Sequence, residues 1–226
     1  MRRTKQEAEH TRRRIMAAAL RTFNRRGIAR TTMEHIADAA AVTRGAIYWH
    51  FADKQALVRA IREEVSLPLV DKSDFTLLND RGTDPLDRIE RFLLDLLHAV
   101  VTDSRTRLVF CVMSFKCEYV GEFESELHEY ARKLEHVRKA LAQVYSEARL
   151  RKQMRAGLTP EIAALETTVF LAGLMRLCLL DKFGAVVRKH APEIVAAHVA
   201  GAARVSYSTA RAVQQAPSST VRLRQP

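Results

Sequence analysis

One stretch, Thr31 to Lys54 (TTMEHIADAAAVTRGAIYWHFADK), constrains the fold of this chain more than any other. Thr31 and Glu34 have the spacing of a capping box, in which each side chain satisfies the other residue's backbone donor, so we expect a helix to begin near Thr32. Apolar side chains then recur at helical spacing as far as Ala40, which gives the helix one face to bury. The stretch therefore predicts a short amphipathic helix.

A second helix is expected directly after the first. Thr43 is a good N-cap for a helix from Arg44 to about Phe51, and the short turn before it matches the steep crossing of a helix-turn-helix. Tyr48 and Trp49 fall on the side of this helix that cannot face its neighbour, and a soluble protein gains nothing by exposing them to water. This exposed side is therefore predicted to be a binding surface.

The chemistry of the exposed side fits duplex DNA. Arg44 can donate two hydrogen bonds to O6 and N7 of a guanine. Gly45 and Ala46 let the helix approach closely, and its N-terminus suits phosphate groups, with hydrogen-bond donors such as Tyr48 available for the same oxygens. The candidate DNA-binding residues are Thr32, Thr43, Arg44, Gly45, Ala46, Tyr48, Trp49, His50 and Lys54.

Most of the positive charge lies in the same part of the chain. The net charge is +11; residues 1–60 hold 13 Lys and Arg against 5 Asp and Glu, whereas residues 61–226 hold 24 against 21. A basic surface alone could serve solubility, but next to a helix-turn-helix it favours binding to a polyanion. The basic arm at the start could either fray or reach DNA through Arg2, Arg3 and Lys5.

These residues also carry a family resemblance. TTMEHIADAA followed by VTRGAIYWHFADK resembles the DNA-binding segment of the TetR family of bacterial regulators, especially its branch of multidrug-efflux repressors. The opening residues up to Thr32 and the segment FKCEYVGEF fit the same branch. The resemblance is specific as far as about Val65 and patchy beyond it. One departure is Ala41, where the branch usually has glycine; alanine is strained there if the turn needs a positive φ.

The rest of the chain shows helical periodicity and no strand alternation, so the predicted fold is all-α. The resemblance implies a three-helix head with the helix-turn-helix and a helical body for ligand binding and dimerisation, about nine helices in all. The domains expected are residues 1–53 for DNA binding, 54–213 for the body and 214–226 as a disordered tail. Beyond the two helices above, we expect helices at 11–26, 54–67, from 85 onward, 106–119, 123–156, 161–183 and 192–213, with a loop at 71–84.

Small side chains on the last two expected helices allow close helix approach, either within one chain or between two. The resemblance implies pairing through these helices as a four-helix bundle, so we expect a homodimer. Its two heads, spaced by about one DNA turn of ~34 Å, would read a palindromic operator in double-stranded DNA. The candidate interface residues are Gly173, Ala197, Ala200 and Gly201.

A ligand cavity between the body helices is expected, although each residue that could line it could equally be plain core. Methionine adapts to varied shapes, and a charged side chain turned inward would need a partner. The resemblance implies an amphipathic or aromatic inducer that shifts the helix at 54–67 and so weakens DNA binding. The candidates are Phe92, Leu96, Phe110, Met113, Lys116, Leu134, Phe170, Leu174 and Arg176.

The sequence carries no motif of a common enzyme class: H-E-x-x-H, G-x-S-x-G, a P-loop and G-x-G-x-x-G are all missing, so we expect no enzyme. The eight histidines show no metal spacing, and neither a metal nor a cofactor is expected. Three cysteines without a short metal-type spacing indicate reduced thiols in a cytoplasmic protein. The apolar run from Val169 to Leu180 is interrupted by Arg176 and too short for a bilayer, so no membrane partner is expected.

The function predicted from these observations is ligand-responsive transcriptional repression, relieved when the ligand binds and directed at a multidrug efflux pump. Two alternatives stay open. The same DNA-binding mechanism could regulate a metabolic or other non-efflux operon, or the chain could be a basic protein that binds nucleic acid without sequence preference. The last alternative predicts equal affinity for all duplexes, whereas a regulator prefers one palindrome.

Overall fold

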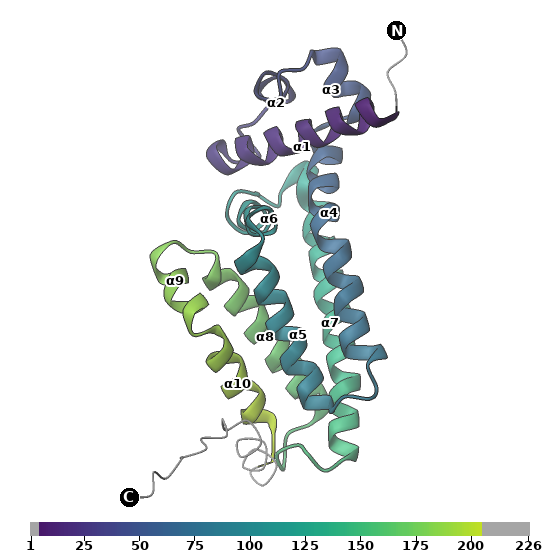
Figure 1. The fold of residues 1–226 in the computed structure, drawn as a ribbon, viewed down its shortest axis with the longest axis vertical. Coiled ribbons are helices and arrows are strands. Elements are labelled where there is room, and N and C mark those ends of the chain that lie inside the picture. The colour runs from purple at the N-terminus through teal and green to yellow at the C-terminus, as the bar shows by residue number, and fades with distance from the viewer. Residues whose placement is uncertain (1–4, 205–226) are drawn as a thin grey trace, which may run out of the picture.

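The computed structural model describes residues 5–204. Within them the chain forms ten α-helices, one π-helical turn and one 3-10 turn, and no strand, which confirms the all-α prediction. Figure 1 shows an elongated molecule with α1, α2 and α3 at one end and long helices running away from them. The expected head and body are both recognisable in this arrangement.

The head consists of α1 (Lys5–Arg26), α2 (Met33–Ala39) and α3 (Arg44–His50). The first helix starts earlier than expected, so part of the basic arm is helical, while residues 1–4, including Arg2 and Arg3, lie outside the described residues. The helix α1 ends at Arg26 and is followed by Gly27, whose φ of +82° is the left-handed conformation that commonly closes a helix.

The capping box of α2 is one residue away from the one predicted. Thr32 is the N-cap: its side chain accepts a hydrogen bond from the backbone of His35, and the His35 ring accepts one from the backbone of Thr32. Thr31 is buried, and its hydroxyl donates to the carbonyl of Gly27 at 2.7 Å. Because Thr31 is already committed to the preceding turn, the pair Thr31 and Glu34 was the wrong choice.

The helix after the head is longer than predicted. α4 (Lys54–Asp74) runs through Pro68 and leads directly into a π-helical turn, η1 (Phe75–Asn79), so the predicted end at Leu67 and most of the predicted loop at 71–84 are wrong. Proline removes the hydrogen bond to the carbonyl four residues earlier. Pro68 and Glu64 are both exposed, so water can satisfy that carbonyl and the helix continues.

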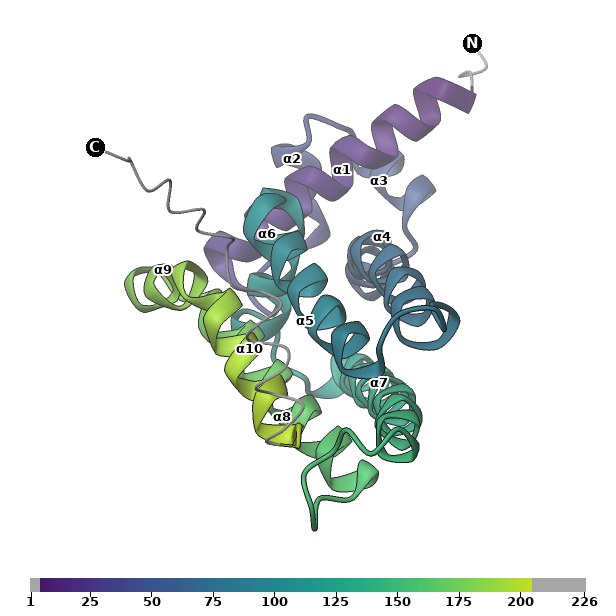
Figure 2. The same cartoon turned by 60° about the horizontal axis from the view of Figure 1, so that its bottom comes forward.

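The body contains α5 (Pro85–Thr102), α6 (Ser104–Phe115), the 3-10 turn η2 (Gly121–Phe123), α7 (Glu124–Leu150), α8 (Pro160–Cys178), α9 (Lys182–Lys189) and α10 (Ala191–Ala202). In both Figure 1 and Figure 2, α5 lies between α10 on one side and α4 on the other.

Several predicted boundaries in the body were wrong. The helices expected at 106–119, 123–156 and 161–183 end earlier, and α9 was not predicted. Lys152 and Gly157 have positive φ values of +58° and +79°, so the backbone turns before α8. The remainder of the helix expected to reach residue 213, and the tail at 214–226, lie outside the described residues.

Two hydrophobic clusters divide the described residues. One is built from α5, α7, α8 and α10, with Phe92, Tyr145 and Val195 among its fully buried members. The other joins α1, α2, α3 and the first half of α4 to Val109 and Val112 of α6. The head core therefore includes a body helix, and α4 is the element that runs from this core along the body.

Candidate nucleic-acid interface and its link to the body

The recognition surface predicted on α3 is exposed. Ile47 is fully buried and anchors the helix, whereas the side chain of Trp49 is 72% exposed and that of Tyr48 is 41% exposed. Thr43 caps the helix by accepting a hydrogen bond from the backbone N–H of Ala46 at 3.1 Å. Two exposed aromatic rings are therefore held on a short helix of fixed direction, where Trp49 contacts only the edge-on ring of His50 among the described rings.

Arg44 and Gly45 open this surface to a close partner. The Arg44 guanidinium lies 5.8 Å from the centre of the Tyr48 ring and 3.4 Å from a carboxylate oxygen of Glu34, and most of its side chain is exposed. A Cβ atom added at Gly45 would meet nothing within 4 Å. None of residues 5–204 requires glycine at this position, so its use fits close approach by an outside molecule.

The turn between α2 and α3 is held by a residue that the sequence did not single out. Arg14 of α1 donates to the carbonyl of Ala40 at 3.0 Å and to that of Ala41 at 2.9 Å. Ala41 itself has a φ of +50°, which residues other than glycine rarely adopt. Alanine is therefore in the positive-φ conformation for which strain was expected at this position. The two hydrogen bonds from Arg14 hold the turn that sets the angle between α2 and α3.

The other candidate DNA-binding residues divide into two groups. Thr32 is exposed at the start of α2, and Ala46 and His50 are half-buried on α3. Lys54 differs, because its ammonium donates to the carbonyl of Ile28 at 3.2 Å, lies 3.4 Å from the carboxylate of Glu122 and is largely shielded from water. The structure brings the first group to one end of the head and turns the Lys54 side chain into the contact between head and body.

Comparison with known proteins now identifies the fold. The family model of bacterial regulatory proteins of the tetR family matches residues 15–61, and that of the C-terminal region of MAATS-type transcriptional repressors matches residues 84–201. The chain belongs to the TetR family. This TetR-family protein is accordingly a DNA-binding transcriptional regulator, and its helix-turn-helix, predicted from the sequence, is confirmed.

Individual relatives cover most of the chain. The HTH-type transcriptional regulator TtgR of Pseudomonas putida is 36% identical over 183 residues, which cover 80% of this chain and 85% of TtgR. AcrR of Shigella flexneri is 33% identical over 195 residues, 86% of this chain and 90% of AcrR. The crystal structure of NalD, the secondary repressor of the MexAB-OprM multidrug efflux pump in Pseudomonas aeruginosa, superposes with a TM-score of 0.78 at 26% identity, covering 88% of this chain and 99% of NalD.

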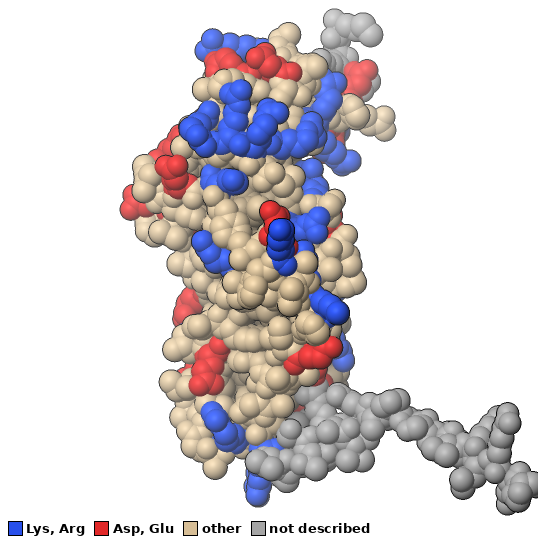
Figure 3. All heavy atoms as spheres, turned by 90° about the vertical axis from the view of Figure 1, so that its left-hand side faces the viewer, with Lys and Arg blue, Asp and Glu red and all other residues tan. Residues whose placement is uncertain are grey.

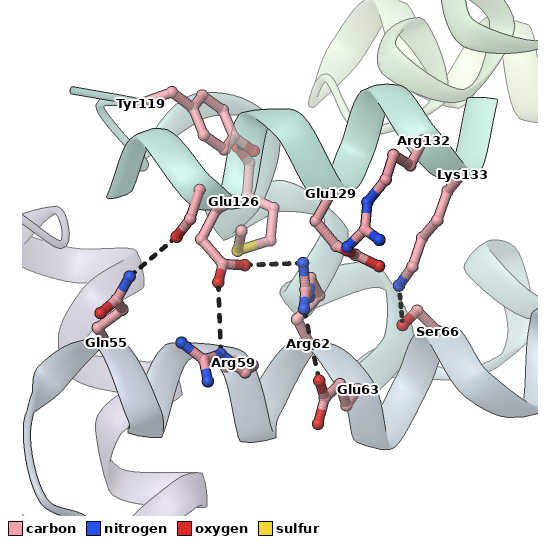
Figure 4. Close-up of polar contacts among 12 residues, drawn as sticks. Gln55, Arg59, Arg62, Glu63, Ser66, Tyr119, Glu126, Glu129, Arg132 and Lys133 are labelled. Atoms are coloured by element: carbon pink, nitrogen blue, oxygen red, sulfur yellow. Dashed lines mark hydrogen bonds and ion pairs between the residues drawn. The ribbon is translucent and has the colours of Figure 1, made fainter. Parts of the chain in front are cut away.

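A network of charged residues joins α4 to α7 below the head (Figure 4). Glu126 of α7 is nearly buried, and its carboxylate lies 2.9 Å from the guanidinium of Arg62 and 4.0 Å from that of Arg59, both on α4. The closer contact does not have the geometry of a hydrogen bond, so the attraction between the two groups is Coulombic. Further along, Lys133 donates to the hydroxyl of Ser66 at 2.7 Å. Displacement of either helix in this TetR-family protein therefore carries an electrostatic cost.

A small cavity of about 10 Å³ lies between α4, η1 and α5, with Ser73, Thr76, Phe92 and Leu96 on its wall. That is roughly the room required by one water molecule. Lys72 and Asp95 also line this cavity, and they form an ion pair with each other at 3.1 Å. A larger ligand would need the helices around this cavity to separate.

The candidate ligand-binding residues do not all gather at one place. Phe92 and Leu96 line the cavity, and Phe170 and Leu174 contribute to the same body core. Leu134 is half-buried on α7. The structure places the remaining four elsewhere: Phe110 and Met113 pack against the head core, and Lys116 and Arg176 are exposed.

The outer faces of α8 and α10 carry unpartnered small and apolar side chains. Large apolar side chains on α8 are between 40% and 65% exposed: Ile162, Leu165, Val169 and Leu177. The candidate interface residues Gly173, Ala197, Ala200 and Gly201 are exposed as well. A Cβ atom at either glycine would meet nothing within 4 Å, so packing within one chain does not explain them.

Other kinds of site find little support in the part of the chain that the structure describes. No group of three or more His, Cys, Asp or Glu side chains there is placed to hold a metal ion. None of its helices has the length and apolar character required to cross a membrane. Burial raises the pKa of Cys117 to about 11, so this thiol stays protonated near neutral pH and is a poor nucleophile.

Proposed function

We propose that this TetR-family protein is a homodimeric repressor that binds a palindromic operator in double-stranded DNA, releases it when an amphipathic or aromatic small molecule binds, and controls a multidrug efflux pump. DNA binding is assigned to residues 1–53, and ligand binding and pairing to the helical body at 54–213. The observation that carries the proposal is the exposed surface of α3, with Arg44, Gly45, Tyr48 and Trp49 held outward on a buried Ile47.

Pairing is supported by the exposed face of α8 and α10. An isologous dimer would bury the apolar stripe of α8 and allow the glycines of both helices to approach a partner closely. One short recognition helix makes few contacts, and two of them spaced by about one DNA turn, ~34 Å, would read both halves of a palindrome.

Control by a ligand is supported by the small pocket next to α4. Enclosing a ligand larger than one water here would separate α4 and α5, and α4 also belongs to the head core. The conformation that admits the ligand would then place the two heads at a different spacing. A coupling free energy of about 1–3 kcal/mol, or roughly 5- to 150-fold in DNA affinity, would suffice to release the promoter.

An efflux pump as the regulated target is supported by the relatives. NalD is described as the repressor of a multidrug efflux pump, and this chain matches it over almost its whole length. The test is a selection of bound duplexes from the producing organism's genome, followed by titration of the complex with a panel of amphipathic dyes and phenols. Selection of a palindrome upstream of pump genes, with release by members of the panel, supports the proposal. Selection upstream of a metabolic operon contradicts efflux control, and absence of any selected sequence contradicts repression.

A further inference from the structure

The ring of His35 in α2 lies between two hydrogen-bond donors. Its Nδ1 accepts the backbone N–H of Thr32 at 3.3 Å, which closes the capping box, and its Nε2 lies 3.1 Å from Nη1 of Arg26 on α1. A neutral imidazole has one acceptor nitrogen, and a guanidinium only donates. Both ring nitrogens therefore face a donor, and the tautomer that completes the capping box through Nδ1 carries its hydrogen on Nε2, next to Arg26.

Two facing donors of this kind require an acceptor from outside the pair. Within residues 5–204 no carboxylate forms an ion pair with Arg26 or with Arg30, whose Nε donates to the backbone carbonyl of Arg26 at 3.0 Å. The carboxylate next in sequence, Glu34, is turned to Arg44. Water can supply this acceptor at an exposed position, and a negatively charged oxygen would bind Nε2–H and the guanidinium together more strongly.

The position of the pair on the head suggests the source of that oxygen. Seen from the side on which α1 ends, Lys and Arg form a band across the head (Figure 3). α2 spans about 10 Å, which is comparable with the ~12 Å width of the major groove. If α3 occupies the groove, the length of α2 is sufficient for its start to reach a flanking phosphate.

We propose that Arg26 and His35 together hold one phosphate of the DNA backbone at the edge of the groove that α3 occupies. This rests on the proposed function, because the phosphate belongs to the duplex that α3 reads. Glutamate or glutamine commonly takes the third helical position in a capping box. A histidine there completes the cap without adding a negative charge next to the phosphate and supplies one more donor.

Three variants separate this contact from a purely structural role. Arg26→Ala removes the guanidinium, His35→Glu keeps a cap acceptor but replaces the donor with a negative charge, and His35→Gln keeps both the cap acceptor and a donor. Arg151→Ala, at the exposed end of α7 far from the head, is the matched control for net charge. Thermal unfolding of each variant checks that the fold persists.

The readout is DNA affinity against salt concentration, for a duplex from the upstream region and for a scrambled duplex. One lost phosphate contact lowers the slope of log K against log salt by about 0.9, and at ~0.15 M salt weakens binding by about fivefold for both duplexes. We expect this result for Arg26→Ala, a larger equal loss for His35→Glu, and less than a twofold change for His35→Gln and Arg151→Ala.

The outcomes also separate this proposal from the proposed function. An unchanged slope in folded Arg26→Ala, or a changed ratio between the two duplexes, overturns the phosphate contact even if the unmodified protein prefers its upstream duplex. If the unmodified protein binds both duplexes equally while the variants lose affinity as expected, the phosphate contact stands and sequence-specific repression fails. If the unmodified protein binds neither duplex, both are overturned.

Discussion

Arg44 and Glu34 lie 3.4 Å apart on the exposed surface that α2 and α3 share, although they belong to different helices. The hydrogen bond from its own backbone amide, with help from Thr32 and Arg44, keeps the pKa of Glu34 below its usual value, so this carboxylate is ionised at neutral pH. A free carboxylate repels DNA, but this one also attracts the guanidinium of Arg44 and biases its direction. Glu34 is therefore expected to contribute to sequence discrimination and to oppose overall affinity.

Substitution of this pair tests the division of roles. Arg44→Ala should lose about 1–3 kcal/mol of discrimination for one base pair, because the bidentate contact to guanine disappears. Glu34→Gln should raise affinity for every duplex while lowering discrimination. Asp38→Asn, also exposed on α2, removes a negative charge without touching Arg44 and should raise affinity alone. Binding-site selection with each variant measures both quantities, and equal discrimination in Glu34→Gln and Asp38→Asn would exclude a positioning role.

Ala41→Gly should stabilise the protein. A non-glycine residue in the left-handed region costs about 1 kcal/mol or more, and glycine adopts that conformation without strain. The midpoint of thermal unfolding should rise by about 2–4 °C for a chain of this length. Ala39→Gly, inside α2, is the control and should lower it, because glycine weakens a helix. A lower midpoint for both variants would show that position 41 is not strained.

Glu126→Gln should destabilise the contact between α4 and α7 strongly. Removing one member of a buried ion pair costs about 3 kcal/mol when the other is left without a partner. Arg62 keeps the carboxylate of Glu63 at 3.5 Å, so the loss should lie below that figure. Arg59→Ala should cost less than about 1 kcal/mol, since Arg59 is half exposed and 4.0 Å away. The double variant Glu126→Leu with Arg62→Met should approach the stability of the unmodified protein. Urea unfolding measures all three, and a loss in Glu126→Gln no greater than in Arg59→Ala would contradict this account.

The stability of the body should fall on mild acidification. The His198 ring stacks on Phe170 with ring centres 3.9 Å apart, and its Nε2 lies 2.9 Å from the hydroxyl of Thr167. Burial lowers the pKa of His198 below 6.5 against the opposing effect of Glu166. The folded state therefore binds this proton less readily than the unfolded state, so stability holds above pH 6.5 and is lost as the pH falls below it.

His198→Gln removes this titration and provides the matched comparison. The free energy of unfolding of the unmodified protein should fall more between pH 7.5 and pH 5.5, values on either side of the ordinary histidine pKa of about 6.5, than that of the variant. Parallel pH profiles for the two proteins would show that His198 does not contribute.

The helix-turn-helix was predictable because its signals are local. Capping residues, a short turn and a helical apolar pattern act within a few residues, and α3 begins at Arg44 as expected. The choice between Thr31 and Thr32 as N-cap was not local in the same way. It depends on whether Thr31 has a competing acceptor, and the carbonyl of Gly27 supplies one.

The contacts between helices that are distant in sequence could not be predicted. Arg14 reaches the turn 26 and 27 residues later, and nothing in its own neighbourhood marks it for that role. Phe110 and Met113 were apolar candidates for the ligand cavity, but apolar character is equally suited to the head core, where they pack. Pro68 misled because proline usually ends a helix, and its tolerance depends on the exposure of a carbonyl.

The most direct measurement of the central claim is the affinity of the purified protein for a duplex from its own upstream region and for a scrambled duplex of the same composition, at ~0.15 M salt. If α3 reads bases in the major groove, the first duplex should bind at least about 10³-fold more tightly, and Arg44→Ala should reduce that ratio. Equal affinity for the two duplexes would contradict it.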